Sequence, residues 1–308
     1  MTKFEDIKNI ILENSKELNE EFKRVFHGRG NFYEGWKFLT VDSIDKILSI
    51  AFYYEIEHQT EEEILEFFKQ FILSSRHEAI ILQRRYLKNS PTEIIEGKIP
   101  KENFALENSL KYKLNLLSNQ NSGYFPDMKK GREYIKSISK DKNVLNLFSY
   151  TCGFSLAAAA GGAKSVTNVD MSKSALTAGR ENHRINGIGT ENINFMPYNI
   201  LKSFSRIKKK GPYDIIIIDP PTFQSGSFAA TKDYAKIIKR LDQLSAENCT
   251  VLSCLNSPDL DSSFIIDLFK EFAPGFEYEK RLVNLDEFKA ADEQRSLKNL
   301  IFIKKRVK

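Results

Sequence analysis

The stretch "DIIIIDPPTFQSG", residues 214–226, sets four consecutive isoleucines between two aspartates and then stops at two prolines. An unbroken apolar run of β-branched residues favours a strand that is buried on both faces of a sheet. Proline cannot continue a sheet ladder and restricts the residue before it, so Pro220 and Pro221 predict a stiff loop beginning at Asp219. The same tripeptide would also suit a simple strand terminator.

Strands and helices alternate around this run from residue 143 onward. Strands are expected at residues 143–148, 165–169, 192–196, 213–218 and 249–255, with helices at about 154–161, 172–187, 200–208 and 231–246. This alternation predicts an α/β fold with a doubly wound parallel sheet. After a further helix, "PDLDSSFIIDLFKEFA", no helix separates the last two apolar runs, "FEYEKRLVNL" and "LKNLIFIKK". We expect them to pair as an antiparallel hairpin at the sheet edge.

The first part of the chain has a different pattern and predicts a smaller α+β domain. A helix is expected over residues 3–24, followed by the strands "KFLTVD" and "KILSIAFYYEI", the helix "TEEEILEFFKQFI" and the strand "EAIILQRRYL". Short strands follow over residues 91–126, and Pro126 and Gly131 indicate a turn before the next helix. We therefore expect two domains, residues 1–115 and residues 116–308.

The composition is that of a globular protein with a mild basic excess. The 308 residues are 41% hydrophobic, and the net charge of +5 permits a polyanionic partner without requiring one. Because no apolar run is long enough to cross a bilayer and the N-terminus lacks a signal-peptide core, we expect a cytoplasmic protein with no membrane partner. Cys152, Cys249 and Cys254 form neither a disulfide framework nor a paired zinc motif, so we expect no metal. The expected state is a monomer or a homodimer.

Polar residues that follow the strands are the candidate ligand contacts, because open parallel sheets bind ligands beyond their carboxyl ends. The segment "SYTCGFS", residues 149–155, lacks the glycine patterns of dinucleotide and P-loop sites, which disfavours NAD or ATP. Asp170 follows the second strand, where a carboxylate can accept both hydroxyls of a ribose. Alternatively, Asp170 caps the helix that starts near Ser172.

Several segments together resemble a known family. "VLNLFSYTCGFSLAAAAGGAKSVTNVDMSKSALTAGRENHRINGI", "YDIIIIDPPTF" and "VLSCLNSPDL" look like class I S-adenosylmethionine-dependent methyltransferases, in particular those that make 5-methylcytosine or 7-methylguanine in large-subunit (23S) ribosomal RNA. The resemblance covers about residues 110–305, and residues 36–90 are more weakly similar to the family's central α+β domain. It implies a seven-stranded Rossmann-like sheet with an antiparallel last strand, RNA as partner and S-adenosyl-L-methionine as cofactor.

The resemblance also implies which residues bind the cofactor. The loop that contains Ser149, Tyr150, Thr151 and Gly153 would hold its methionine part, Asp170 its ribose, and Met171 one face of its adenine. Asn199 stands where the family carries an acidic residue, as a neutral acceptor for the adenine amino group. The segment "SGYFPDMKKGR" would place Phe125, Asp127 and Arg132 nearby. Cys152 replaces a family glycine, which puts the backbone geometry of this loop in doubt.

The target base would lie beside "DPPTF". The resemblance implies catalytic roles for Asp219 and Pro220 and substrate contacts for Pro221, Thr222 and Phe223. Methylation of cytosine C5 needs a nucleophile, because a thiolate must first add at C6 and a base must later remove the C5 proton.

Cys254 stands where the cytosine branch of the family carries that thiol, although a small buried thiol is also ordinary core material. The alternative is direct attack by a guanine nitrogen, for which positioning is sufficient. We expect 5-methylcytosine formation ahead of guanine modification. The rival interpretations are a non-catalytic RNA-binding or assembly factor and a small-molecule methyltransferase, which the family match disfavours.

RNA contact is expected from the small domain and from two basic stretches, "LQRRYLK" and "RIKKKG", unless these are merely solvated faces. Aromatic residues in "FHGRGNFYEGW", together with Arg29, would be able to stack an unpaired base, but packing explains most of them equally well. The four histidines are scattered along the chain, and His183 is expected at the surface.

Overall fold

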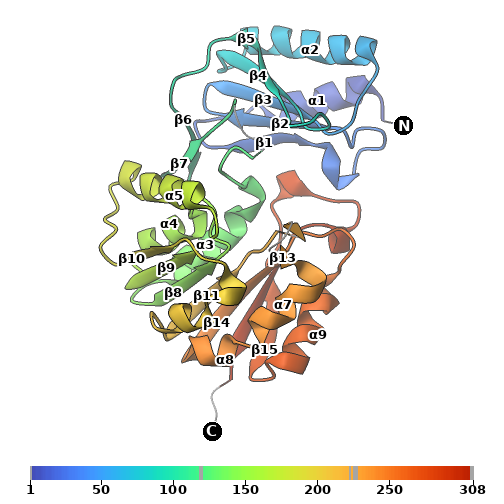
Figure 1. The fold of residues 1–308 in the computed structure, drawn as a ribbon. Helices are drawn as coiled ribbons and strands as arrows, with labels where there is room; N and C mark the ends of the chain where they lie inside the picture. The colour runs from blue at the N-terminus through green and yellow to red at the C-terminus, as the bar shows by residue number, and fades with distance from the viewer. Residues whose placement is uncertain (1, 118–120, 222, 225–227, 306–308) are drawn as a thin grey trace. The chain divides into compact units, whose positions relative to one another are not determined.

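The computed structural model describes residues 2–117, 121–221, 223–224 and 228–305. The chain forms two compact units (Figure 1). The first unit comprises Met1–Pro126 and Leu285–Ala291, and the second comprises Asp127–Asn284 and Asp292–Lys308. The C-terminal half therefore contributes a short segment to the first unit. The boundary between two domains that the sequence analysis places between residues 115 and 116 stays a prediction.

The first unit is a five-stranded sheet with two helices on one face. The strand order is β1-β2-β3-β4-β5, in which β3 and β4 are parallel and the other neighbours are antiparallel. The elements are α1 (Phe4–Asn14), β1 (Lys23–His27), η1 (Gly28–Gly30), β2 (Leu39–Ile44), β3 (Ile47–Phe52), α2 (His58–Leu73), β4 (Ala79–Arg84), β5 (Thr92–Gly97), a separate hairpin of β6 (Asn103–Glu107) and β7 (Leu110–Leu114), and η4 (Asp286–Phe288).

The core of this unit follows from the strand period of two residues. Leu48, Ile50 and Phe52 alternate along β3 and are fully buried in one cluster with Ile11 of α1 and Phe68 of α2. Both helices therefore cover the same face of the sheet.

The helix predicted over residues 3–24 is wrong in its second half. Helix α1 ends at Asn14, and residues 23–27 form β1, which pairs with β2. Val25 and Phe26 are both buried because the register shifts between Arg24 and Phe26. Pairing with the sheet thus overrides the local helical pattern, which is a tertiary effect that periodicity alone does not reveal.

The second unit is the predicted seven-stranded sheet, with strand order β10-β9-β8-β11-β14-β16-β15. Six of the seven strands point the same way, and β16 runs antiparallel to both of its neighbours, which confirms the α/β fold and the antiparallel last strand. Its strands are β8 (Asn143–Leu147), β9 (Ser165–Val169), β10 (Ile193–Met196), β11 (Tyr213–Ile218), β14 (Ser245–Leu255), β15 (Phe276–Arg281) and β16 (Lys298–Lys304); β12 (Phe223–Gln224) and β13 (Phe228–Ala229) pair separately.

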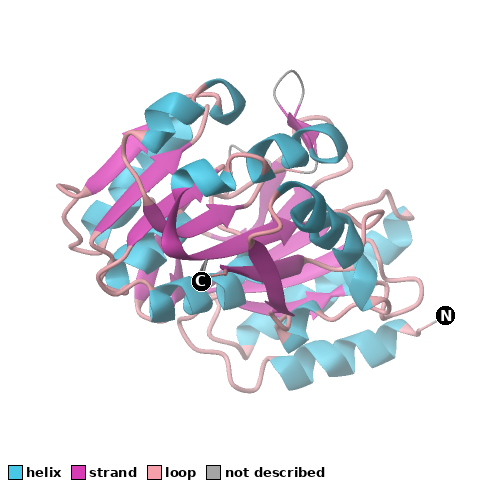
Figure 2. Ribbon diagram, turned by 90° about the horizontal axis from the view of Figure 1, so that it is seen from below, coloured by secondary structure: helices cyan, strands magenta, loops and turns pink. Residues whose placement is uncertain are grey.

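Helices lie on both faces of this sheet (Figure 2). They are α3 (Lys129–Ile138), α4 (Gly153–Ala160), α5 (Lys173–Ile185), α6 (Phe204–Lys208), α7 (Ala230–Ile238), α8 (Leu241–Leu244) and α9 (Ser262–Phe272), with the short helices η2 (Pro126–Met128), η3 (Ile200–Lys202) and η5 (Glu293–Arg295). No helix in the described ranges is long and apolar enough to cross a membrane.

The four isoleucines of β11 are buried on both faces, as the sequence predicts. Ile215 and Ile217 pack in the cluster that contains residues of α3 and α4, whereas Ile216 and Ile218 pack in the cluster that contains residues of α7 and α9. Burying one such side chain contributes roughly 1.5–3 kcal/mol, so this strand anchors both halves of the core.

Gly131 lies inside α3 and not in the predicted turn before it. A Cβ at this position would lie 3.2 Å from the ring of Phe154 in α4. The glycine therefore permits a close approach of α3 to α4. Gly131 thus serves helix packing, and the turn that the sequence analysis expected at this residue is wrong.

Candidate active site

The loops that follow the parallel strands β8, β9 and β10 meet at one edge of the sheet and line an open pocket. The pocket brings together three predicted residues, Asp170, Met171 and Asn199. It is also lined by residues that sequence reasoning missed, Phe148, Ile200, Leu201 and Phe228. Phe148 directly follows the strand β8, and its position after a parallel strand was a signal for a pocket residue that the sequence analysis did not use. No local sequence pattern points to Phe228.

Asp170 fastens two loops at the pocket. One carboxylate oxygen accepts a hydrogen bond from the Tyr150 backbone N–H at 2.8 Å, and the other accepts one from the Ser172 N–H, also at 2.8 Å. The helix cap itself is Ser172, whose hydroxyl accepts from the backbone of Ala175. A carboxylate has about four acceptor positions, so Asp170 retains capacity for a ligand.

The loop after β8 holds an uncommon backbone conformation. Phe148, Tyr150 and Cys152 have positive φ angles of 58°, 45° and 61°. Left-handed backbone costs an L-residue roughly 1–2 kcal/mol, and such strain gathers at binding loops. The buried hydroxyl of Ser149 has only a weak contact with Cys152 and no regular hydrogen-bond partner within the described chain. Buried Thr151 is held through its carbonyl, which accepts from the Asn182 side chain at 3.0 Å.

Cys152 fits here because Gly179 makes room for it. A Cβ at Gly179 of α5 would lie 2.4 Å from the Cys152 sulfur and 2.8 Å from its Cβ. Burial raises the pKa of this thiol to about 12, so it remains protonated. The loop that contains Cys152 is thus well packed, and Gly153 begins α4 directly after it.

His183 lies under this loop and not at the surface as predicted. Its side chain is fully buried, with Nδ1 2.8 Å from the Gly179 carbonyl and Nε2 3.1 Å from the Ser155 hydroxyl. Burial lowers its pKa, so the neutral ring donates to the carbonyl and accepts from the hydroxyl. Ser155 in turn accepts from Asn168 at 2.9 Å, and this polar network joins α4, α5 and β9.

A second group of predicted residues surrounds the end of β11. Burial raises the pKa of Asp219 to about 7, the charge of Asp127 adds to this effect, and Arg132 opposes it. Asp127 belongs to η2 and Arg132 to α3, so charges from two further elements act on the Asp219 carboxyl. Asp219 is therefore partly ionised near neutral pH.

The remaining residues of the predicted rim are only partly described. Pro220 is buried and Pro221 is exposed. Thr222 lies outside the described residues, and Phe223 is the first residue of β12. Phe125 belongs to the first unit and has 42% of its surface exposed. Its cofactor role remains a prediction.

Cys254 is fully buried in β14, within the apolar cluster that contains Ile135 and Leu252. Burial raises the thiol pKa well above its ordinary value, and the charges of Asp219 and Asp127 raise it further. The preceding Ser253 points to the opposite face, where its hydroxyl lies 2.8 Å from that of Tyr234. Cys249 is buried as well.

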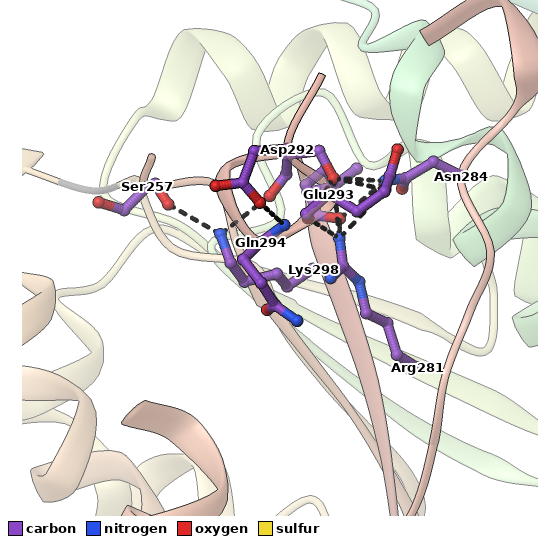
Figure 3. A network of polar contacts seen from close by, with 9 residues as sticks. Ser257, Arg281, Asn284, Asp292, Glu293, Gln294 and Lys298 are labelled. Atoms are coloured by element: carbon purple, nitrogen blue, oxygen red, sulfur yellow. Dashed lines mark hydrogen bonds and ion pairs between the residues drawn. The ribbon is translucent and has the colours of Figure 1, made fainter. Parts of the chain in front are cut away.

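A polar network fastens the segment where the chain leaves and re-enters the second unit (Figure 3). Lys298 is fully buried and donates to the carbonyls of Ser257 at 2.8 Å and Ser296 at 2.9 Å. Arg281 beside it donates to the Glu293 carbonyl at 2.7 Å. Because Ser257 follows β14, Lys298 holds the loop after Cys254 in place.

Three comparisons relate this chain to known proteins. A family model described as S-adenosylmethionine-dependent methyltransferase matches residues 23–303. Ribosomal RNA large subunit methyltransferase I of Aeromonas salmonicida (strain A449) is 31% identical over 197 residues, which are 62% of this chain and 49% of that protein. YwbD of Bacillus subtilis (strain 168), named as a candidate large-subunit ribosomal RNA methyltransferase, is 29% identical over 279 residues, covering 86% of this chain and 68% of YwbD.

A solved structure is similar over nearly the whole chain. SMU.776, described as a candidate methyltransferase and solved in complex with SAH, superposes with a TM-score of 0.85 at 25% identity, covering 97% of this chain and 80% of SMU.776. The chain spans about half the length of the Aeromonas salmonicida relative.

The contact between Cys152 and Gly179 predicts a coupled pair of substitutions. Gly179→Ala should lower the free energy of unfolding by about 1–3 kcal/mol, because the new methyl group overlaps the Cys152 side chain. Cys152→Gly in the same chain should recover most of this loss in urea unfolding. Gly187→Ala is the matched control, since it strains a positive φ with no neighbour within 4 Å. In that background Cys152→Gly should change the free energy of unfolding only by the amount that it changes in the wild type. Additive effects for Gly179→Ala and Cys152→Gly would contradict the account.

Buried Lys298 predicts a pH dependence of stability. Burial, followed by the charge of Arg281, lowers its pKa from 10.5 to about 8. Between these two values the unfolded chain binds the proton and the folded chain does not, so folding is favoured as pH rises. Relative to Lys298→Met, the wild type should gain unfolding free energy from pH 8 to pH 10.5, with a slope of at most about 1.4 kcal/mol per pH unit. A constant difference over this range would exclude the lowered pKa.

Proposed function

We propose that this chain, which belongs to the family of S-adenosylmethionine-dependent methyltransferases, methylates a base of large-subunit ribosomal RNA. The observation that carries the proposal is the pocket at the ends of β8, β9 and β10, in a fold that SMU.776 shares. The names of the Aeromonas salmonicida and Bacillus subtilis relatives support ribosomal RNA as the substrate class.

The residues of the pocket fit the family's cofactor. Asp170 has spare acceptor positions for two ribose hydroxyls, while the exposed thioether of Met171 offers an apolar face for adenine. The Asn199 side-chain oxygen accepts from the Lys202 N–H at 3.2 Å and keeps a second lone pair for an amino group. The strained loop at Ser149–Gly153 leaves a buried hydroxyl available. When bound, S-adenosylmethionine supplies an electrophilic methyl group on a sulfonium.

We propose a nitrogen of the base as the methyl acceptor, in place of the cytosine carbon expected from sequence. Cys254 is sealed in an apolar cluster, and its pKa lies well above the ordinary value, so a thiolate is disfavoured. A nitrogen lone pair needs only to be held in line with the methyl group. Asp219, with a pKa of about 7, would accept a hydrogen bond from the base and so orient this lone pair.

The cytosine route is the second candidate. In addition to burial, the charge of Asp219 raises the pKa of the Cys254 thiol, and the same proximity offers a carboxylate as a base for the thiol proton. On this route Asp219 would take the thiol proton as the sulfur bonds to C6, and C5 would then take the methyl group. Removal of the C5 proton by a base would break the C6–S bond, which releases 5-methylcytosine and restores the cysteine. The two routes differ in whether Cys254 is required.

Nucleoside mass spectrometry tests the proposal and separates the routes. Ribosomal RNA from cells that lack the gene should lose one methylated base, and the purified protein with S-adenosylmethionine should restore it. Asp219→Asn should slow methyl transfer by about 100-fold or more, because the amide is a poorer acceptor. Cys254→Ala should transfer methyl groups at nearly the wild-type rate, as should the control Cys249→Ala.

A restored 5-methylcytosine, together with loss of transfer in Cys254→Ala at unchanged cofactor affinity, would establish the cytosine route. RNA binding by the wild type with no methyl gained by any base would favour a non-catalytic RNA-binding factor and overturn the proposal.

A further inference from the structure

The carboxyl ends of three strands meet at one end of the sheet in the first unit. β1 and β3 are both antiparallel to β2, and β4 is parallel to β3, so β1, β3 and β4 point the same way. The loops that follow them supply Arg29, Tyr53 and Arg85. Residues that lie far apart in the sequence are thereby gathered at one sheet end.

The two arginine side chains both lie over the ring of Tyr53. The Arg29 guanidinium lies over the Tyr53 ring at 4.0 Å from its centroid, and the Arg85 guanidinium lies over the same ring at 5.2 Å. Arg85 also donates to the amide oxygens of Gln83 at 3.0 Å and Asn121 at 3.3 Å. Guanidinium planes that are fixed on an aromatic ring are well suited to stack bases and to pair with phosphates.

Arg29 is presented by a rigid loop. It is the middle residue of η1, between Gly28 and Gly30. A Cβ at Gly28 would lie 1.8 Å from the Trp36 carbonyl oxygen, and one at Gly30 would lie 2.1 Å from the Lys289 carbonyl oxygen. Only glycines allow this backbone packing, so the "HGRGN" motif fixes the position of Arg29.

The surroundings of Arg29 and Arg85 carry a net positive charge. Asp42 accepts hydrogen bonds from Arg24 through both carboxylate oxygens, so the two charges of this largely buried pair neutralise each other. His27 is neutral, because burial and the nearby arginines lower its pKa to about 3. Among the residues that the structure describes, Arg29 has no carboxylate partner, and its side chain is exposed. Arg29 is therefore available to an anion.

An exposed aromatic ring, that of Phe32, follows Arg29 by three residues in the chain. Phe32 has 53% of its surface exposed, although Phe26 and Trp36 of the same motif are buried in the core. The Lys289 ammonium lies over the Phe32 ring at 5.2 Å. The motif thus contains residues that pack in the core and one ring that faces solvent.

We propose that Arg29, Phe32, Tyr53, Arg85 and Lys289 form a binding site for an unpaired RNA segment. The arginines and Lys289 pair with phosphates, and the Phe32 ring and the Arg29 plane stack bases. Exposed rings and guanidinium planes engage unstacked bases, which a duplex does not offer. The inference rests on the proposed function for the identity of its ligand.

Fluorescence anisotropy with a single-stranded RNA of about 12 nucleotides and its matched duplex tests this site. Arg29→Ala should weaken single-strand binding by about tenfold and lower the slope of log affinity against log salt by about 1. Phe32→Ala should weaken binding by a similar factor without changing the salt slope. The wild type should prefer the single strand.

Lys98→Ala is the matched control, because it removes one exposed charge at the opposite end of the same sheet, beside Gly97, which pairs with Ala79. It should leave affinity nearly unchanged, and all variants should keep the wild-type melting temperature. Equal effects of Arg29→Ala and Lys98→Ala, or duplex binding as tight as single-strand binding, would overturn the site. Methyl transfer is scored separately, so this site and the proposed function can fail independently.

Discussion

The two hydrogen bonds that the Asp170 carboxylate accepts hold the pocket of the second unit together. They fix the Tyr150 N–H of the loop after β8 and the Ser172 N–H that opens α5. The strained conformation of the first loop persists only because its surroundings impose it, and Asp170 is the part of those surroundings that also faces the pocket. The same side chain thus shapes the loop and offers its remaining lone pairs to a ligand.

Both units use one physical rule to gather their functional residues. Strands that run parallel end at the same edge, so the loops after them come together from distant parts of the sequence. In the second unit this rule assembles Asp170 and Asn199, and in the first unit it assembles Arg29 and Arg85. A parallel arrangement of buried strands is therefore a structural requirement of both sites.

Much of this organisation could be predicted from the sequence because it is encoded locally. The isoleucines of β11 and the prolines after Asp219 specify a doubly buried strand and its end. Features that depend on distant partners could not be predicted. β1 forms because β2 pairs with it, Gly179 matters because Cys152 occupies its space, and the pocket wall at Phe228 comes from a separate loop. Polar His183 lies in the interior because Ser155 and Gly179 satisfy its ring nitrogens.

Titration calorimetry with S-adenosylmethionine tests the central claim most directly. The wild type should bind one equivalent, and Asp170→Ala should abolish binding. Asp214→Ala is the matched control, because that carboxylate also accepts a backbone N–H, from Asn143 at 2.8 Å, at the start of β11. It should retain cofactor affinity. Absence of binding by the wild type, or equal affinity in Asp170→Ala, would contradict the account.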